Sequence, residues 1–201
     1  MTRNIAVGVT AASGAIYGLR TIAALLDAGC RLEIVFSEYG RRLLIDEIAD
    51  DAKVDRMGEW LAARYGEGVR NGTFSLHSNK DLGSALASGS HPCDAMVIVP
   101  CSMKTLAGVA HGLSRNLIER AADVMLKERR RLVLVPRETP MSLPQLRNMV
   151  AAAEAGAMVL PAMPAFYQKP KTIDDLASFI AGKILNAVGF EQRLFTPWKG
   201  E

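Results

Sequence analysis

The sequence predicts an α/β fold in which a doubly wound parallel sheet forms the middle of three layers. Short, almost wholly apolar runs recur along the chain, and such runs are typical of parallel strands buried on both faces. Segments with apolar residues at helical spacing alternate with these runs. Hydroxyl or charged side chains follow the runs directly, at the edge of a parallel sheet where ligands bind.

Length and composition suit one globular domain over residues 1–201, with an irregular tail from about residue 190, since 49% of residues are hydrophobic and 22% are charged. The net charge of +3 comes from scattered Lys and Arg residues, unlike the basic patch of a nucleic-acid-binding protein. No apolar run approaches the roughly 18 residues of a membrane span. The N-terminus leads directly into a strand, so we expect no signal peptide.

The cysteines and histidines argue against disulfides and metal binding. Cys30, Cys93 and Cys101 are odd in number and lack metal-ligand spacing, which favours a reduced, cytoplasmic protein. The three histidines are far apart and form no HExxH pattern, so we expect no catalytic metal.

The first predicted strand, Ile5–Val9, is followed by a turn of small residues, Thr10–Gly14. A helix with apolar residues at helical spacing comes next and stops at Gly29. The turn lacks the GxGxxG fingerprint of dinucleotide binding, which disfavours NAD. Ser13 either caps this helix or faces a flavin or phosphate with the helix amino end behind it.

The second predicted strand, Arg31–Phe36, ends at Ser37. A helix follows, and its residue Glu47 shares a face with Leu43 and Leu44. Glu47 is therefore either a surface acid at the edge of this face or an acid that needs a partner.

Between residues 52 and 93 the pattern is less regular, with a helix predicted up to Tyr65 and a short strand near Thr73–Leu76. Ser88-Gly89-Ser90 is a hydroxyl-rich loop that suits phosphate binding and an ordinary turn equally well. The pattern of residues leaves both interpretations open.

The apolar run Ala95–Val99 predicts the central strand, bounded by Pro100. Ser102 and Thr105 stand where the next helix begins. They can cap this helix, and they can also offer hydroxyl and backbone N–H groups to an anionic ligand.

Arg120 and Lys127 share one face of the following helix, which starts around Ser114–Leu117. Their spacing of seven residues separates them by two turns, or about 10 Å. Both side chains are either solvated or directed into a pocket of a neighbouring subunit.

Another apolar run, Leu132–Val135, predicts a buried strand. It is followed by Pro136–Pro140, a proline-held turn that contains Arg137 and Glu138. A rigid loop at a strand end is a good place for an acid or a base. The next helix has Ser142 as its predicted cap. Its apolar face consists of Leu146, Met149 and Val150.

The last predicted strand, Ala157–Leu160, leads into a proline-held loop that ends in Phe166 and Tyr167. Aromatic residues on a loop suit a pocket wall or a subunit interface. The final helix opens at Ile173–Asp175, and Lys183 falls on the same face as its apolar residues. Lys183 either extends to the surface or points at a bound phosphate.

Five predicted strand ends thus carry polar groups, namely Ser13, Ser37, Ser102, Glu138 and Tyr167. The carboxyl ends of parallel strands lie along one edge of a sheet. We therefore expect one site for an anionic cofactor at this edge.

Several longer motifs resemble those of the UbiX-type flavin prenyltransferases, a family formerly described as aromatic acid decarboxylases. The motifs are Thr10–Ala15, Pro100–Gly108, Arg120–Val124, Leu126–Arg130, Arg137–Pro140 and Pro164–Tyr167. The resemblance extends from about residue 4 to about residue 190.

This resemblance implies a flavodoxin-like Rossmann fold, usually assembled as a homododecamer with FMN bound between subunits. It implies transfer of a dimethylallyl group from dimethylallyl phosphate to N5 and C6 of reduced FMN, without a metal. A partner decarboxylase of the UbiD type then uses the prenylated FMN.

The resemblance also implies roles for individual residues. The flavin would be lined by Ala11, Ala12, Ser13, Ser37, Ser102, Met103, Lys104, Thr105 and Arg137. The phosphate of dimethylallyl phosphate would be held by Tyr167, Lys183, Ser88, Gly89, Ser90, Arg120 and Lys127, partly from a neighbouring chain. The catalytic group would consist of Glu138, Glu47, Ser13 and Tyr167, with Glu138 as the main proton-handling acid.

Two positions depart from the family pattern. Ala11 stands where the family usually has glycine, and a methyl group costs about 1 kcal/mol of flavin affinity if the position needs positive φ or a close approach of the flavin. Lys183 stands where the family usually has arginine, so the charge is kept but the bidentate fork is lost. Both changes bear on affinity more than on the reaction class.

Three alternatives are an FMN-dependent cysteine decarboxylase, a non-catalytic FMN carrier, and a decarboxylase in its own right. The first needs a histidine base at a helix start, and His77, His91 and His111 do not follow strand ends in that way. A pure carrier would leave the cluster of Glu138 and Tyr167 without a chemical purpose. The phosphate and the pyrophosphate are both open as donors.

Overall fold

A parallel sheet forms the middle layer of the protein. In the computed structural model, which describes residues 2–49, 54–198 and 200, six strands pair in the order β3-β2-β1-β4-β5-β6. The strands are β1 (Asn4–Val9), β2 (Arg31–Phe36), β3 (Thr73–Ser78), β4 (Ala95–Cys101), β5 (Arg131–Pro136) and β6 (Met158–Val159). Each neighbouring pair is parallel. Because the chain starts in the middle and builds outwards to one edge and then the other, the sheet is doubly wound, as predicted.

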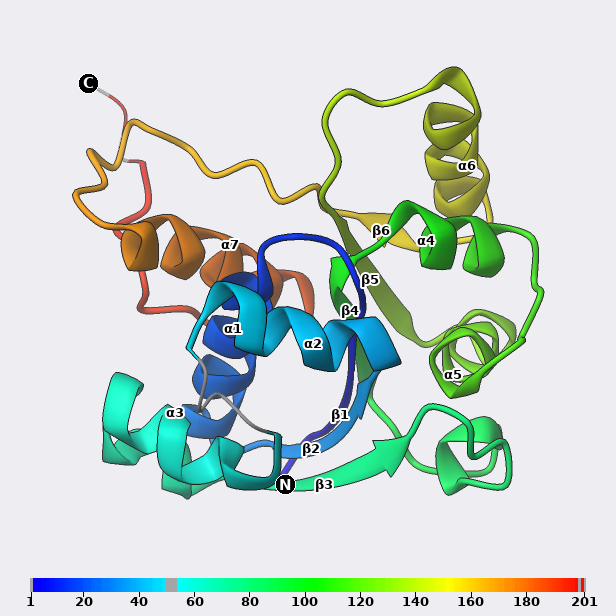
Figure 1. The fold of residues 1–201 in the computed structure, drawn as a ribbon, viewed down its shortest axis with the longest axis horizontal. Helices are drawn as coiled ribbons and strands as arrows, with labels where there is room; N and C mark the ends of the chain where they lie inside the picture. Colours follow the sequence, from blue (N-terminus) through cyan, green and yellow to red (C-terminus); the bar gives the residue numbers. More distant parts are fainter. Residues whose placement is uncertain (1, 50–53, 199, 201) are drawn as a thin grey trace.

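Helices cover both faces of this sheet (Figure 1). They are α1 (Ala15–Asp27), α2 (Glu38–Glu47), α3 (Met57–Tyr65), α4 (Met103–Ala110), α5 (Leu117–Lys127), α6 (Leu143–Glu154) and α7 (Ile173–Ala187), with short 3-10 helices η1 (Val54–Arg56), η2 (Glu67–Asn71) and η3 (Ala85–Ala87). α1, α3 and α7 pack on one face, and α4 and α5 pack on the other. This is the three-layer α/β fold that the sequence predicts.

The strand side chains alternate between two apolar clusters, one on each face of the sheet. In β1, Ile5 and Val7 join the cluster of α1 and α7, whereas Ala6 joins the cluster of α4 and α5. Both clusters exclude water, since these three residues are at most 1% exposed. Burial on both faces requires an apolar residue at nearly every position, which is why the strands stand out in the sequence as continuous apolar runs.

Two strands differ from their predicted bounds. β4 continues through Pro100 and Cys101, where we expected it to end. Its pairing with β5 is irregular between Ile98 and Cys101, and this irregularity accommodates a proline that has no N–H to donate. β6 covers only Met158–Val159, which is shorter than the predicted stretch from 157 to 160.

The apolar face of α6 is largely exposed, unlike that of a helix packed on the core. Leu146 is 45% exposed and Val150 is 58% exposed, and the buried residue of the helix is Ala152. α6 packs against α4 and the short edge strand β6, so little of the chain is available to cover its apolar side chains. Exposed apolar residues of this kind are typical of a surface that contacts another protein chain.

Lys183 is exposed, although it lies among residues of the apolar face of α7. Phe179, Ile180 and Ile184 of this face are buried. Because successive helical residues turn by about 100°, Lys183 lies about 40° from Phe179 and about 60° from Ile180. Of the two interpretations of Lys183, the structure shows the one in which the side chain extends to the surface.

After α7 the chain is irregular. Residues 190–198 form no helix or strand. The structure does not describe residues 52 and 53, which belong to the stretch expected to be less regular. It also does not describe residues 199 and 201 of the tail. No helix of the described residues is long and apolar enough to cross a membrane.

The three cysteines are buried as free thiols. Burial raises the pKa of the Cys30 and Cys93 thiols to about 11 and also raises the pKa of Cys101. We therefore predict that none reacts with a thiol reagent at pH 8 in the native protein, whereas all three react in denaturant.

The same raised pKa values predict a loss of stability at high pH. Unfolded thiols ionise near pH 9.0 and the folded ones near pH 11, so the unfolded state releases protons first as the pH rises. The free energy of unfolding should therefore fall between pH 9 and pH 11, which urea titrations at several pH values measure. A free energy of unfolding that stays constant between pH 9 and pH 11 would contradict this prediction.

For the labelling experiment, rapid reaction of one native thiol at pH 8 would contradict the burial of that residue.

Candidate active site at the carboxyl ends of the strands

The turn after β1 brings the amino end of α1 against the side chain of Glu47. Gly14 caps the helix with a φ of 111°, a conformation that favours glycine. The Glu47 carboxylate accepts hydrogen bonds from the backbone N–H groups of Gly14 and Ala15, both at 2.8 Å. Glu47 is thus an exposed acid, as one interpretation expects, and it also has a partner, the positive end of α1.

The ends of β1 and β4 are joined by the hydroxyl of Thr10. This hydroxyl donates to the carbonyl oxygen of Pro100 at 2.9 Å and accepts from the backbone N–H of Ser102 at 2.7 Å. Thr10 is 2% exposed. Sequence analysis did not single it out, although a polar residue at the end of an apolar strand is a signal for such a bridge.

The first turn of α4 presents hydroxyl and N–H groups at the same edge of the sheet. The Ser102 hydroxyl accepts from the backbone N–H of Thr105 at 3.2 Å and donates to its hydroxyl at 3.1 Å. Ser102 thus caps the helix as predicted. The N–H groups of Met103 and Lys104 belong to the first helical turn, which has no acceptors within the helix, so they are available to an anionic ligand.

The start of α2 lies directly against the end of β1. The backbone N–H of Ser37 donates to the carbonyl oxygen of Val9 at 2.9 Å, and the Ser37 hydroxyl caps α2 by accepting from Gly40 at 3.0 Å. A Cβ atom at position 40 would lie 2.6 Å from the Val9 oxygen. The glycine therefore permits this close approach.

The segment that directly follows β5 contributes Arg137 and Glu138, both half-buried. Arg137 Nε donates to the carbonyl oxygen of Ser13 at 2.8 Å and so links the end of β5 to the turn after β1. Glu138 Oε1 accepts from the backbone N–H of Thr139 at 3.1 Å, which leaves its second oxygen available. The guanidinium of Arg137 thus lies beside the turn that carries Ser13, and Glu138 is its neighbour in the chain.

A cavity of about 410 Å³ opens beside the turn after β1, next to Glu47 and Arg137, and its lining among the described residues includes neither Ser37 nor Ser102 nor Glu138. It is lined by Ser13, Gly14, Ile16, Tyr17, Glu47, Ile48, Arg64, Arg137 and Ile173. Tyr17, Arg64 and Ile173 were missed by sequence analysis because they project from helices, where helical periodicity alone does not distinguish a cavity wall from a packed surface. Burial raises the pKa of the Tyr17 phenol, opposed by the Arg137 guanidinium, so this phenol stays protonated at neutral pH.

Ala11 is not strained at its position. The described non-glycine residues with positive φ are Ser114, Arg129 and Lys169. The methyl group of Ala11 is exposed, and that of Ala12 is buried. The cost that a left-handed backbone would impose at Ala11 therefore does not arise.

Tyr167 lies on the loop after β6, with its ring against two other aromatic rings. Its centroid is 6.1 Å from that of Phe179 and 5.4 Å from that of Trp198, in edge-to-face geometry. Tyr167 is still 45% exposed, and its neighbour Phe166 is 73% exposed. Lys183 follows Phe179 by one helical turn, so it lies near this aromatic group on the protein surface.

A second group of predicted residues gathers elsewhere, where the loop after η3 meets α5. Arg120 Nε donates to the carbonyl oxygen of Ala87 at 3.1 Å, and a Cβ atom at Gly89 would lie 2.7 Å from Lys127 Nζ. Arg130, just before the first residue of β5, donates to the Gly89 carbonyl oxygen at 2.7 Å. The group formed by Ser88, Gly89, Ser90, Arg120 and Lys127 therefore extends towards the amino ends of the strands, opposite to Ser13 and Arg137.

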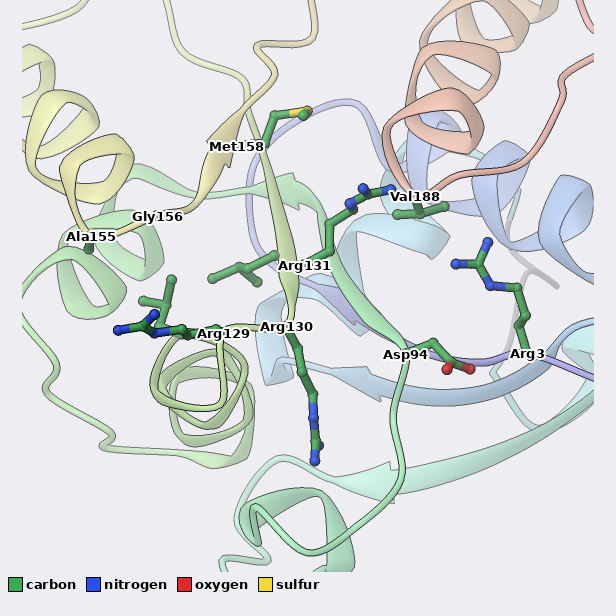
Figure 2. Close-up of a pocket in the computed structure, with 11 residues that line it drawn as sticks. Arg3, Asp94, Arg129, Arg130, Arg131, Ala155, Gly156, Met158 and Val188 are labelled. Carbon is green, nitrogen blue, oxygen red and sulfur yellow. The ribbon is translucent and has the colours of Figure 1, made fainter.

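Another cavity, of about 660 Å³, also lies at the amino ends of the strands. Figure 2 shows that its three consecutive arginines, Arg129–Arg131, point in different directions. Arg3 and Arg130 donate instead to backbone carbonyl oxygens, those of Gly189 and Gly89. Cations that diverge in this way do not form a binding site, so we place the candidate site at the carboxyl ends.

Comparisons with known proteins give a consistent family. The family model described as Flavoprotein matches residues 1–185. The flavin prenyltransferase UbiX of Halalkalibacterium halodurans is 46% identical over 97% of this chain and 93% of its own length. AnUbiX, whose structure was solved in complex with FMN and dimethylallyl pyrophosphate, is 37% identical in sequence to this chain. The match has a TM-score of 0.88 and covers 100% of both chains. A dodecameric FMN-dependent UbiX-like decarboxylase from Escherichia coli is 36% identical over 98% of this chain and 100% of its own, with a TM-score of 0.86.

Fold and site together define a flavoprotein with a flavodoxin-like sheet. Within that class, the chain belongs to the family of UbiX flavin prenyltransferases. The FMN-dependent cysteine decarboxylase TvaF, at 17% identity and a TM-score of 0.53, shares the fold alone.

Replacement of Thr10 tests the bridge between β1 and β4. Thr10→Val keeps the shape but leaves the Ser102 N–H and the Pro100 carbonyl without this partner, so we predict a loss of about 2 kcal/mol in the free energy of unfolding. Thr10→Ser keeps the hydroxyl and serves as the matched control. Urea unfolding of both variants measures the effect, and a change below about 0.5 kcal/mol in Thr10→Val would exclude an important bridge.

Proposed function

We propose that this protein joins a dimethylallyl group from dimethylallyl phosphate or pyrophosphate to N5 and C6 of reduced FMN. The observation that carries the proposal is the alignment of hydroxyl, N–H and guanidinium groups at the carboxyl edge, from Ser102 to Arg137, in a chain of the UbiX family. FMN is the prenyl acceptor in this reaction and is therefore treated as a substrate.

The chain offers a good fit for FMN at this edge. The first turn of α4 supplies free N–H groups beside the hydroxyls of Ser102 and Thr105, which is the donor set that an anionic phosphate prefers. Glu47 already neutralises the amino end of α1, so this end suits an uncharged part of the ligand. Ala11, Ala12, Ser13 and Ser37 complete the proposed flavin site, with Met103, Lys104 and Arg137.

Glu138 is the acid that we propose to remove the proton from the flavin ring. Its carboxylate has one hydrogen bond from a backbone N–H and lies next to Arg137 at the mouth of the site. Glu47 holds two backbone N–H donors, so its carboxylate is stabilised as a helix cap. We therefore give Glu47 a positioning role and keep Ser13, Tyr167 and Glu138 next to the reacting groups.

We propose that a complete site needs more than one copy of the chain. Ser88, Gly89 and Ser90, with Arg120 and Lys127, extend towards the amino edge of the sheet, whereas Tyr167 follows the carboxyl end of β6. A neighbouring chain can bring one group to the other, and both would then hold the phosphate of the prenyl donor together with Lys183. The exposed apolar face of α6 and the exposed residues Met163 and Phe166 support assembly, which we propose to be dodecameric.

The remaining parts of the proposal concern location and partner. Free, buried cysteines suit the reducing cytoplasm, where we place the protein. The product would pass to a UbiD-type decarboxylase. Transfer of the product to another protein suits an enzyme that releases a modified flavin as its product, rather than one that retains its flavin as a cofactor.

The alternatives find less support. A cysteine decarboxylase needs a histidine base, but the three histidines lie elsewhere: His77 in β3, His91 in the loop before β4 and His111 at the end of α4. A pure carrier gives no role to Glu138 or to the cations around Gly89. We therefore keep prenyl transfer as the proposed reaction.

The decisive experiment is mass spectrometry of the flavin after anaerobic incubation with reduced FMN and either prenyl donor. We expect a flavin heavier by one five-carbon prenyl unit. Glu138→Gln should keep bound FMN and slow product formation on the order of 100-fold, since general acid–base catalysis contributes about that much.

Other outcomes each point to a different function. Tightly bound but unmodified FMN would favour the carrier, and release of carbon dioxide from a phenolic acid by the pure protein would favour a decarboxylase. Absence of bound flavin would contradict the proposed site itself.

Lys183→Arg tests the cation near Tyr167. A guanidinium can form two parallel hydrogen bonds to a phosphate, so we expect dimethylallyl phosphate to bind about fivefold more tightly. Titration calorimetry with the FMN-bound protein measures this, and Lys80→Arg, at an exposed position in the loop after β3, is the control. Unchanged affinity in Lys183→Arg would remove this residue from the phosphate site.

A further inference from the structure

Glu33 is a buried acid that the proposed mechanism does not use. It lies in the middle of β2, between Ala6 of β1 and Ser75 of β3, and is 3% exposed. Its side chain lies on the same face of the sheet as Val35 of β2, which packs in one cluster with Leu86 of η3. A carboxylate in such a place requires partners.

Two histidines supply those partners. His77 Nε2 lies 2.6 Å from Glu33 Oε2, and His91 Nε2 lies 4.0 Å from Glu33 Oε1. The other ring nitrogen of His77 is 3.2 Å from the Ser84 hydroxyl. Arg31 Nε, 3.4 Å from Glu33 Oε1, completes the set.

These contacts reach both ends of one loop. Ser84 begins η3, and His91 directly follows the loop Ser88-Gly89-Ser90. The two histidines therefore attach the segment from 84 to 91 to the same buried carboxylate, one at each end. The middle of the segment is the short helix η3, which packs on α5 and buries Leu86. The two ends of the segment depend on polar contacts such as these.

Arginines hold the middle of the segment through its carbonyl oxygens. Arg120 donates to the Ala87 oxygen at 3.1 Å, and Arg130 donates to the oxygens of Gly89 at 2.7 Å and His91 at 2.8 Å. Ser88 and Ser90 remain exposed, with their hydroxyls 2.8 Å apart. The carbonyl oxygens of the segment are therefore bound to the protein, while its two hydroxyls face outwards together.

We propose that Glu33 is a positioning residue which, through His77 and His91, fixes both ends of the Ser88–Ser90 loop and thereby sets the affinity for the prenyl-donor phosphate. This inference rests on the proposed function, in which the loop contributes to that phosphate site. Glu33 itself does not touch the ligand. Its contribution is to hold the two hydroxyls in the geometry that binds the phosphate, before the ligand arrives.

Glu33→Gln tests the inference, because the amide keeps the shape but loses the charge that attracts two imidazoles. The control is Glu119→Gln. Glu119 is equally buried, at 2% exposed. It pairs with Arg115 at 2.9 Å and packs against Gly108 of α4. We expect Glu33→Gln to raise the KM for dimethylallyl phosphate about tenfold while kcat and bound FMN stay nearly unchanged. Glu119→Gln should leave this KM unchanged.

Hydrogen exchange of the backbone amides of residues 84–91 gives a second readout that does not depend on activity. Faster exchange there in Glu33→Gln, together with the raised KM, would support the inference. Faster exchange with an unchanged KM would overturn the link to substrate, and unchanged exchange would overturn the anchor itself. Ser84→Ala, at a half-buried position, makes the same test with a smaller change if Glu33→Gln does not fold.

An inactive wild-type protein would be a separate result. It would contradict the proposed prenyl transfer, and with it the role of Glu33 in substrate affinity. The exchange measurement would still show whether Glu33 anchors the loop, so the two failures are distinguishable.

Discussion

The parallel pairing of β1 with β2 on one side and β4 on the other is the constraint on which the rest of the structure depends. It places three strand ends next to each other, and the buried hydroxyl of Thr10 joins two of them. Ser37 and Ser102 then start their helices at fixed distances from the turn that carries Ser13. The site is therefore assembled from backbone geometry first, and side chains complete it.

Much of this could be predicted from the sequence because strands buried on both faces require apolar residues throughout, and parallel strands bring their carboxyl ends together. Ser37, Ser102 and Ser142 cap helices where they were expected to. The exposed face of α6 and the position of Lys183 were not predictable in the same way. An apolar helical stripe has the same pattern whether its partner lies in the same chain or in another one, and a long lysine side chain on such a stripe can extend to the surface.

The candidate site follows the same division. Residues on strand ends were found because topology alone places them, whereas Thr10, Tyr17 and Arg64 depend on which way a side chain points after packing. The loop at Ser88–Ser90 shows a further limit, since Arg130, which binds the Gly89 carbonyl oxygen, is distant in sequence, and so is Glu33, which pairs with His77 and His91. Under the proposed function, one chain holds two groups of phosphate-binding residues towards opposite ends of the strands, and assembly would then be a part of the chemistry.

The carboxylate of Glu47 at the amino end of α1 has a consequence for ligand choice. Two helices, α1 and α4, start at the same edge of the sheet, and each would attract an anion. Because the protein supplies its own negative charge to α1, we expect a second anion there to be repelled and α4 to be the more favourable place for a phosphate. Under the proposed function, FMN would then bind in one orientation, and riboflavin, which lacks the phosphate, would lose both the attraction and the direction.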